Sequence, residues 1–217
     1  MAVREMLVYF DEGRDPLVNL RRESELFERF DGGGLPECVR FWVNTECLVR
    51  GRAKSAKYGW YDEAMAAKMK VPVIERSTGG GVVYQDEGNL NWSFFLKTPG
   101  TFVSPVIAFK QASEYVTRAL KRLGVQAEFS PPNRIDVKGR KVSGMAARST
   151  VRSLLVHGTL LIDSDLDRLN LLCIPPPYCP PVSNISEFAG GINAAEVAKA
   201  VVAVLKESDF DVLTAHE

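Results

Sequence analysis

The sequence predicts an α+β domain with a mixed, largely antiparallel β-sheet flanked by helices. Strand-like and helix-like segments mix along the 217 residues without the strict alternation of a doubly wound parallel sheet. With 46% hydrophobic and 25% charged residues, the composition is that of a globular chain long enough to bury a core. No Pro-, Gly- or Ser-rich tract is long enough to be a linker, so residues 1–217 are expected to form one domain.

The charge balance, the lack of a long apolar run and the cysteine spacing argue against a nucleic-acid partner, a membrane protein and a zinc site. The 27 Lys and Arg balance the 27 Asp and Glu, so no overall field favours a nucleic acid or a membrane as partner. Charged residues interrupt the first ten positions and no apolar run approaches the ~18 residues of a membrane span, which predicts a cytoplasmic protein. The four cysteines fit no zinc pattern. Cys173 and Cys179 bracket a proline-rich loop and could close as a disulfide, although free thiols are expected.

The N-terminal third predicts one helix and a hairpin. Asp15 followed by Pro16 marks a helix start, and the helix is expected to run to about Phe30, where Gly32–Gly34 end it. Its apolar face is expected to carry Leu17, Leu20, Ser24 and Phe27. Residues 38–43 and 46–50 are expected to form two strands of a hairpin around 44–45.

The central part predicts a short helix, three strands and the longest helix. Asp62 caps the short helix through Met69, and residues 71–75, 81–84 and 90–96 are the strands. Ser104 and Pro105 open the long helix, which Gly124 ends. Its apolar stripe is Phe109, Ala112, Val116, Leu120 and Leu123.

The C-terminal part predicts two or three strands and a last helix. Residues 135–147 and 154–163 supply the strands, with a tight turn at Lys138 and Gly139. Asn193 with Glu196 three residues later is the pattern of a capping box, and Val197, Val201 and Leu205 then face inward.

The segment 75–90 is the most informative for function. Gly79, Gly80 and Gly81 join two predicted strands, and a turn without side chains lets backbone N–H groups approach an anion or an acyl carbonyl. No GK[ST] follows and no helix begins at the glycines, which excludes a P-loop and a dinucleotide fingerprint. A plain glycine-rich hairpin is the alternative, and the neighbouring Arg76 and Asp86 favour a binding site.

Two further segments carry candidate residues. In an extended 140–142 segment, Arg140 and Lys141 point to opposite faces, and the small Gly139 and Ser143 leave room for a ligand beside Lys141. A solvated lysine is the alternative. In the strand 155–162, Gly158 removes a side chain where a backbone or ligand can approach, whereas an isolated histidine such as the one before it is commonly a core residue.

Together these segments resemble the lipoate-protein ligase A family, the biotin/lipoate A/B protein ligase catalytic domain, whose lipoate branch also contains octanoyltransferases. Residues 76–81 with Asp86 and Asn89 resemble the motif RRxxGGGxVxHDxGN, residues 139–144 resemble GrKxxG, and residues 157–161 resemble HGTLL. Weaker likeness extends to Asn19, Leu20, Glu23, Gly51 and 183–186. The motifs occur in the family's order, and the resemblance spans about residues 15 to 206.

The resemblance implies a fold like the catalytic domain of class II aminoacyl-tRNA synthetases and biotin protein ligases. It implies a lipoate-protein ligase, an enzyme that forms lipoyl-AMP from lipoate and ATP with Mg²⁺ and transfers the lipoyl group to a lysine. The implied partners are lipoyl acceptor domains of 2-oxoacid dehydrogenases or the glycine cleavage H protein. The sequence leaves the choice among lipoate, octanoate and biotin open.

The resemblance also implies site residues. Lys141 is the expected catalytic cation at the acyl–phosphate junction, a role that suits the compact charge of a lysine. Asn133 or Asp136 are candidates for Mg²⁺ or ribose, and no metal ligand is assigned. The full set expected to bind substrate or ATP is Arg76, Ser77, Thr78, Gly79, Gly80, Gly81, Asp86, Asn89, Asn133, Asp136, Ser143, Gly144, His157, Gly158 and Thr159.

Three positions depart from the family pattern. Glu75 precedes Arg76 where the family has paired arginines, Gln85 replaces a histidine, and Arg134 replaces the aspartate of an Asn-Asp pair. The first places a negative charge where a phosphate-binding cation is expected. Asp136 would replace the missing aspartate only if the backbone shifts by two residues.

Two alternatives to the ligase stay open. One is a transferase that moves octanoyl from a carrier protein through a cysteine thioester, for which Cys173 and Cys179 are candidates, whereas 128–130 lacks the cysteine of another transferase group. The other is a non-catalytic lipoyl-binding homologue. Ligases of this family commonly carry an accessory C-terminal domain; none is expected within these residues, and a separate small protein is expected to supply it.

Overall fold

A mixed eight-stranded sheet forms the centre of the computed structural model, which describes residues 4–52, 60–208 and 210–215. In the described residues the strand order is β13-β1-β2-β7-β11-β10-β9-β8. The two pairings of β1 are parallel and the others antiparallel, as predicted. The bounds are β1 Arg4–Phe10, β2 Glu37–Trp42, β7 Asn89–Lys97, β8 Ala127–Ser130, β9 Arg134–Val137, β10 Arg140–Ser149, β11 Ser153–Leu161 and β13 Phe210–Thr214.

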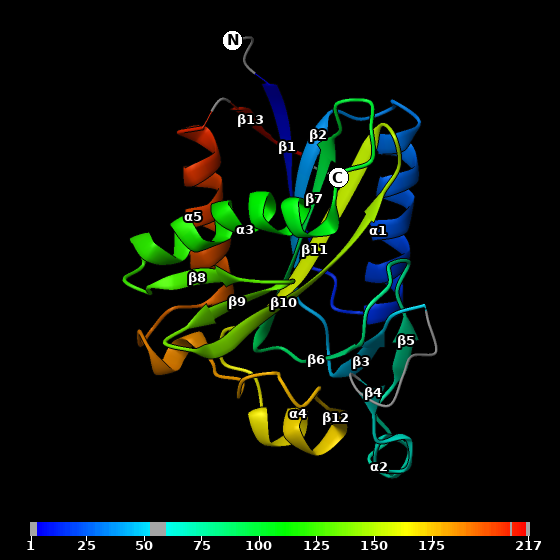
Figure 1. Ribbon diagram of the computed structural model, residues 1–217, viewed down its shortest axis with the longest axis vertical. Coiled ribbons are helices and arrows are strands. Elements are labelled where there is room, and N and C mark those ends of the chain that lie inside the picture. The colour runs from blue at the N-terminus through cyan, green and yellow to red at the C-terminus, as the bar shows by residue number, and fades with distance from the viewer. Residues whose placement is uncertain (1–3, 53–59, 209, 216–217) are drawn as a thin grey trace.

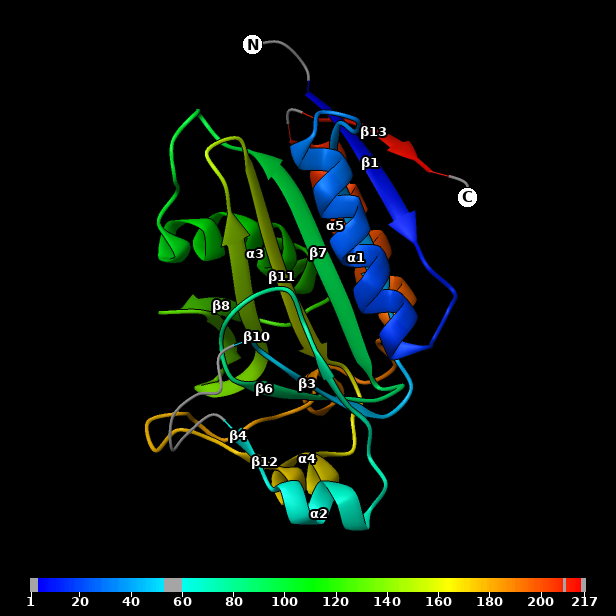
Figure 2. The ribbon, with the colours of Figure 1, turned by 90° about the vertical axis from the view of Figure 1, so that its right-hand side faces the viewer.

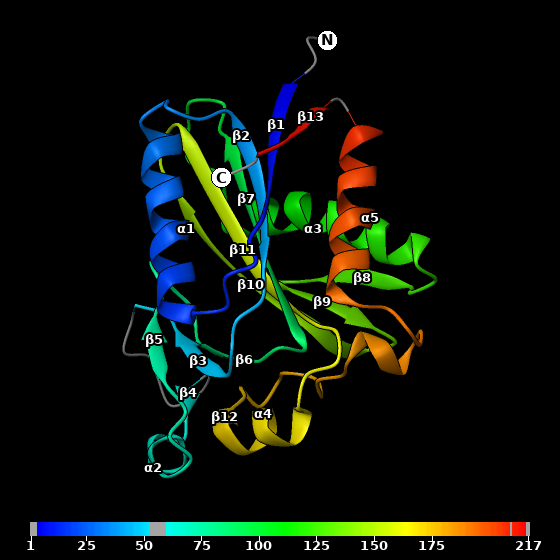
Figure 3. The same ribbon diagram turned by 180° about the vertical axis from the view of Figure 1, so that it is seen from behind.

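Helices cover both faces of this sheet (Figure 1). The helix α1 (Pro16–Asp31) packs on one face, and α3 (Pro105–Arg122) and α5 (Ala194–Lys206) pack on the other (Figure 2). The larger core lies between the sheet and the pair α3 and α5, with Trp92, Phe94 and Leu120 among its buried members. A smaller core beneath α1 contains Phe27 and Phe95. The view from behind shows the same three layers (Figure 3).

Short elements gather at one end of the sheet (Figure 1). A small sheet contains β3 (Cys47–Arg50) between β5 (Val73–Glu75) and β6 (Val82–Gln85). A two-stranded sheet pairs β4 (Trp60–Tyr61) with β12 (Cys173–Ile174). The helices α2 (Glu63–Lys68) and α4 (Leu166–Leu172) lie beside them, and a 3₁₀ turn covers Ile185–Glu187.

Local signals predicted the helices well. The Asp15 carboxylate accepts from two backbone N–H groups of the first turn of α1, Asp62 caps α2, and Asn193 forms the capping box of α5. Gly124 has the positive φ of 85° that ends α3, and both residues of the turn at 138–139 have positive φ. Ser104 precedes α3 without a side-chain capping bond.

The predicted apolar face of α1 was right for Leu20 and Phe27, which are buried, and wrong for Leu17 and Ser24. Leu17 is 55% exposed and Ser24 is half-buried, because the face that meets the sheet begins one residue earlier. The buried residues are Pro16, Asn19, Leu20, Glu23, Leu26, Phe27 and Phe30. Two of these side chains are polar, which disguised the helical stripe in the sequence.

The predicted hairpin at 44–45 was also wrong, and the alternative of a plain hairpin at the glycines is not formed. The strands β2 and β3 belong to different sheets, because the chain bends at Asn44, whose buried side chain bonds to Asn19 and Gln85. The strands β5 and β6 both pair with β3 rather than with each other, so the glycines do not close a simple hairpin. The strands β1, β4, β8, β12 and β13 and the helix α4 were not predicted.

The structure bears on two expectations drawn from composition, the state of the cysteines and the presence of a membrane-spanning helix. All four cysteines are free, so the disulfide alternative is not formed in this structure. Within the described ranges, every helix falls short of the length and apolar character that a membrane crossing requires.

We predict that Gly88→Ala destabilises the fold. A Cβ at this position would lie 2.1 Å from the Asp163 carbonyl oxygen. The backbone there cannot easily move, because the N–H groups of Ile162 and Asp163 both donate to the Gly88 carbonyl oxygen. Forced overpacking of this kind costs about 1–3 kcal/mol. Urea unfolding of Gly88→Ala and of the control Gly190→Ala, whose Cβ meets nothing within 4 Å, measures the difference. Equal midpoints for the two variants would contradict the predicted clash.

Candidate functional site

Two adjoining cavities lie where the three predicted segments meet. The larger cavity has a volume of about 410 Å³ and the smaller one about 260 Å³. Lys141, Gly144 and Thr159 line both of them. The glycine loop, β10, β11 and the loop at 176–179 all contribute to the larger cavity, so the fold brings together segments that lie far apart in the sequence.

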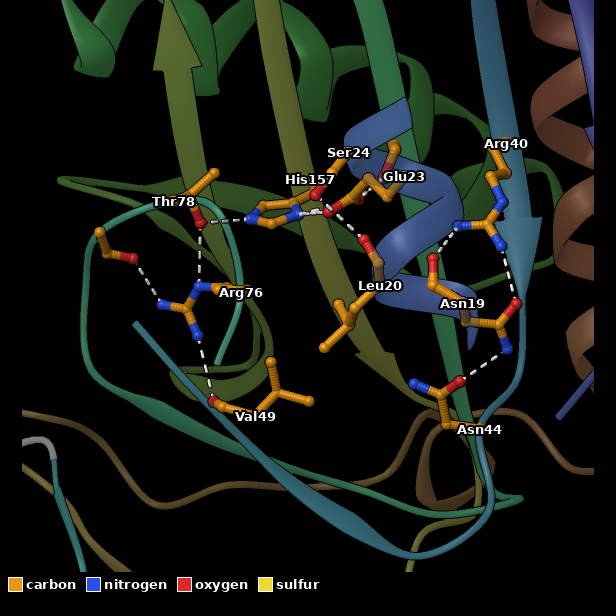
Figure 4. A network of polar contacts seen from close by, with 12 residues as sticks. Asn19, Leu20, Glu23, Ser24, Arg40, Asn44, Val49, Arg76, Thr78 and His157 are labelled. Carbon is orange, nitrogen blue, oxygen red and sulfur yellow. Dashed lines mark hydrogen bonds and ion pairs between the residues drawn. The ribbon is translucent and has the colours of Figure 1, made fainter. Parts of the chain in front are cut away.

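A chain of buried hydrogen bonds supports the wall of the larger cavity (Figure 4). The Glu23 carboxylate on α1 lies 2.9 Å from His157 Nδ1 on β11, and His157 Nε2 lies 2.7 Å from Thr78 Oγ1. A carboxylate only accepts, so Nδ1–H donates to Glu23. Thr78 Oγ1 in turn accepts from Arg76 Nε at 3.0 Å. The Glu23–His157–Thr78–Arg76 relay therefore links α1 and β11 to the glycine loop.

The charges in this relay compensate one another. Burial alone would raise the pKa of Glu23, but His157, Ser93 and Arg40 outweigh burial and hold that pKa below its ordinary value. Glu23 is therefore ionised at neutral pH. Burial lowers the pKa of Arg76 to about 10, with Glu23 opposing the shift, so Arg76 stays a cation at neutral pH.

Arg76 lines the larger cavity and also anchors the glycine loop. Its Nη1 donates to the Val49 carbonyl at 3.1 Å and its Nη2 donates to the Gly79 carbonyl at 2.6 Å. With Nε bound to Thr78, all three guanidinium nitrogens have partners within the protein. The arginine that the sequence suggested as a ligand group is thus the anchor that shapes the glycine loop.

The glycine loop needs its glycines for conformation and for close packing. Gly80 has a φ of +92°, and a Cβ there would lie 2.8 Å from Arg76 Nη2. Gly51 packs against the loop so closely that its Cβ would lie 2.2 Å from the Gly80 carbonyl oxygen. The backbone N–H of Gly51 donates to Gly81, which ties the loop to the end of β3. Gly80 and Gly81 line the larger cavity with backbone only.

Lys141 points into the cavities, as the predicted alternation requires. Its neighbour Arg140 turns the other way and pairs with Glu187 at 2.7 Å. A Cβ on Gly144 would lie 3.2 Å from Lys141 Nζ, so the absent side chain makes room for the ammonium group. Among the described residues, that ammonium group has no ion-pair or hydrogen-bond partner, and it is free to meet an anion.

Other predicted residues line the cavities through small or polar groups. Asn133 lines the larger cavity and donates its amide N–H to the Met145 carbonyl at 2.7 Å, so its side-chain oxygen stays open. Ser143 lines the smaller cavity, and its buried Oγ has no hydrogen-bond partner among the residues that the structure describes. Gly158 lines the larger cavity, and a Cβ there would lie 2.5 Å from the Trp92 ring.

Several predicted residues lie outside the cavity lining. Asp86 accepts from the backbone N–H groups of Gly88 and Asp165 and so orders two loops. The Asp136 carboxylate accepts from Arg134 Nε, and the Thr78 hydroxyl group bonds to His157, which itself lines the larger cavity. The other predicted residues not lining either cavity are Ser77, Gly79 and Asn89.

Sequence reasoning missed two charged residues of the site. Glu23 was noted only as part of a weak resemblance, although its place in the helical stripe with Leu26, Phe27 and Phe30 marks it as a buried carboxylate. Arg134 was noted only as a departure from a motif, yet it lines the larger cavity. No local pattern distinguishes Arg134 from a surface charge.

The donor set does not fit a magnesium ion held by the protein. Protein-bound Mg²⁺ is usually held through one or two carboxylates. Within the described residues neither cavity is lined by an aspartate or glutamate, and no group of three or more His, Cys, Asp or Glu is placed to hold a metal ion. Asp136, the candidate carboxylate, is buried behind Arg134.

The two cysteines near the site differ in their surroundings. Cys179 lines both cavities and Cys173 lines the smaller one. Burial raises the pKa of the Cys173 thiol to about 12, although the charge of Lys141 opposes the shift. Cys173 therefore stays a thiol at neutral pH, which is unfavourable for a nucleophile.

Comparison with known proteins places this site in a family. The lipoyl protein ligase A/B catalytic domain matches residues 15–206. Lipoate-protein ligase LplJ of Bacillus subtilis is 36% identical over 157 residues, which cover 71% of this chain and 45% of that protein. The chain spans about half the length of the curated relatives that it matches.

Solved structures share the fold. Lipoate-protein ligase A bound with ATP superposes with a TM-score of 0.82 at 24% identity, covering 100% of this chain and 90% of that one. A bi-partite lipoate protein ligase of Thermoplasma acidophilum, studied with its E2 lipoyl domain, gives a TM-score of 0.78 at 23% identity and covers 100% and 89%. With its motifs in order and the family match over most of its length, the chain belongs to the lipoyl protein ligase A/B catalytic domain family.

Proposed function

We propose that this chain catalyses ATP-dependent lipoylation. In the first step the lipoate carboxylate attacks the α-phosphorus of ATP, giving lipoyl-AMP and pyrophosphate. In the second step the amine of an acceptor lysine attacks the lipoyl carbonyl, forming an amide and releasing AMP and a proton. The observation that carries the proposal is the unpartnered ammonium group of Lys141 at the junction of two cavities.

The first step brings the lipoate carboxylate and the phosphates of ATP together, and these two anions repel each other. Lys141 lies where a carboxylate in one cavity meets a phosphate in the other, and its charge reduces their repulsion in the transition state. Gly80 and Gly81 line the larger cavity without side chains and so leave room for the ligand. The Glu23–His157–Thr78–Arg76 relay holds this part of the cavity wall in place. The open oxygen of Asn133 and the unpaired Oγ of Ser143 supply further polar contacts.

The relatives support the choice of substrates and partners. Lipoate is favoured over octanoate or biotin because the matching relatives are named lipoate-protein ligases. The Thermoplasma ligase was studied with an E2 lipoyl domain, which supports lipoyl domains of 2-oxoacid dehydrogenases as acceptors. The glycine cleavage H protein as acceptor, the cytoplasmic location and Mg²⁺ stay predictions. Because the lining offers no carboxylate, Mg²⁺ would reach the site as the counterion of ATP.

The non-catalytic alternative rested on the negative charge of Glu75. The structure pairs Glu75 with Arg50 at 2.6 Å, which neutralises that charge beside the glycine loop. Glu75 therefore does not repel an anionic ligand as an isolated carboxylate would. The ligase reaction needs no enzyme thiol, whereas the transferase alternative depends on one.

We expect Lys141→Ala to slow lipoyl-AMP formation by roughly 10²–10³-fold, because a positioned cation is lost from a preorganised site. Pyrophosphate release with ATP and lipoate measures the rate, and a thermal melt confirms that the variant is folded. Arg140→Ala is the matched control, because the Arg140 side chain turns away from the cavities and pairs with Glu187. A folded Lys141→Ala variant with nearly unchanged activity would contradict the assignment.

The double variant Cys173→Ser, Cys179→Ser is expected to keep its ATP-dependent activity within about threefold, because attack on an adenylate requires no enzyme thiol. The measurement is lipoyl transfer to an acceptor domain, followed by the mass of the acceptor. Mixing the unaltered protein with octanoyl carrier protein tests the alternative. An octanoyl thioester trapped on either cysteine would establish the transferase instead.

A separate accessory protein is expected to accelerate adenylation. The wall of the larger cavity includes the exposed Gly80 and Tyr178, the latter 78% exposed, so the cavity opens to solvent. Closure that excludes water strengthens the electrostatic contacts to phosphate. The chain alone should transfer lipoyl from supplied lipoyl-AMP but adenylate lipoate slowly or not at all. Adenylation by the chain alone at about 1 s⁻¹ or faster would show that no partner is needed.

A further inference from the structure

Arg134 is a cation held in place with its free end toward the larger cavity. Its Nε donates to both carboxylate oxygens of Asp136, at 3.1 and 3.0 Å. Asp136 is buried, so this contact fixes the stem of the guanidinium group from behind. Among the described residues the two terminal amino groups of Arg134 have no hydrogen-bond partner. A guanidinium group presents these donors in a rigid plane, which suits the oxygens of a phosphate.

The sheet brings Arg134 close to Lys141. Arg134 on β9 lies directly opposite Gly144 on β10. Side chains of directly opposed residues share a face of the sheet, with Cβ atoms about 5 Å apart. The space where a Gly144 side chain would stand is occupied by the Lys141 ammonium group, 3.2 Å from the position of the missing Cβ. Two cations therefore converge on one end of the larger cavity.

Within the described part of the chain, no acidic side chain lines either cavity. Asp136 lies opposite Lys141 on the neighbouring strand, but its carboxylate is buried and paired with Arg134 Nε. Two cations at one end of a cavity attract an anion more strongly the more negative charge it carries. The arrangement therefore suits a polyphosphate better than a single carboxylate.

We infer that Arg134 binds the phosphate chain of the nucleoside triphosphate beside Lys141, so that two protein cations neutralise the phosphates with little need for a divalent metal ion. The inference rests on the proposed function for the identity of the ligand. It adds a second phosphate-binding residue to the site. It also adds a testable property, because the affinity for the nucleotide should persist without Mg²⁺. The lack of a carboxylate in the lining, which leaves Mg²⁺ without a protein ligand, agrees with that property.

Titration calorimetry with ATP tests the inference, once in EDTA and once in MgCl₂. The unaltered protein is expected to bind ATP with dissociation constants that agree within about threefold in the two buffers. Charge-assisted hydrogen bonds contribute enough that losing Arg134 should raise the dissociation constant in EDTA by about 10–100-fold. The loss in MgCl₂ should be smaller, and adenosine, which has no phosphate, should bind the variant and the unaltered protein equally.

The variants are chosen so that a folding defect is not mistaken for a binding defect. Arg134→Gln alone would leave the buried Asp136 carboxylate unpaired, so the test variant is Arg134→Gln, Asp136→Asn, which removes both charges. Arg134→Lys keeps a cation beside Asp136 and should retain most of the affinity. Arg140→Gln removes an arginine of the adjacent strand that pairs with Glu187 outside the cavities, and it should bind ATP normally.

The outcomes separate this inference from the proposed function. If the double variant binds ATP in EDTA as tightly as the unaltered protein, or if EDTA weakens binding to the unaltered protein more than tenfold, the role of Arg134 is refuted while ligase activity stands. If Arg134 controls ATP affinity as expected but the chain neither forms lipoyl-AMP from lipoate nor transfers lipoyl from supplied lipoyl-AMP to an acceptor domain, the proposed reaction fails and the phosphate site stands. A protein that binds no ATP in either buffer refutes both.

Discussion

The buried carboxylate of Glu23 is the constraint on which the site depends. At 1% exposure an ionised carboxylate is stable only when partners replace its lost hydration. Those partners are His157 on β11 and Ser93 on β7, so helix α1 can dock on the sheet only in the register that brings the three together. Through His157 the same requirement extends to Thr78 and Arg76, and so to the shape of the glycine loop.

A second buried network extends this coupling along the same helix (Figure 4). Asn19 accepts from Arg40 on β2 and donates to Asn44, and Asn44 donates to Gln85 at the end of β6. Asn19 and Glu23 lie one helical turn apart, so α1 contacts two walls of the site through a single face. The bend at Asn44 satisfies these buried amides and directs β3 into the small sheet, which carries the glycine loop.

The sequence predicts a feature well when the interacting residues lie close together along the chain, and poorly when they lie far apart. Helix starts at Asp15, Asp62 and Asn193 depend on neighbours three residues away, and they were predicted correctly. Strand pairing depends on distant partners, which is why the hairpin at 44–45 was wrong and the strands β1 and β13 were missed. The motif segments identified the regions of the site, but the separate roles of Arg76 and Arg134 depend on which partner occupies each guanidinium nitrogen, and that is set by tertiary contacts.

The overall charge of zero conceals a strongly sorted charge distribution in the site. Each carboxylate near the site has a partner within the protein: Glu23 bonds to His157, whereas Asp136 and Glu75 pair with the cations Arg134 and Arg50. Each carboxylate fixes the orientation of its partner, whereas the cavity surfaces within the described residues carry only neutral and basic groups. Because these cations are held in place before a ligand arrives, the site does not have to reorganise when it binds an anion, and that preorganisation is what makes fixed charges effective on developing charge. The same sorting explains how a chain without net charge can favour two anionic substrates at once: within the described residues Arg134 and Lys141 line the larger cavity, and no carboxylate does.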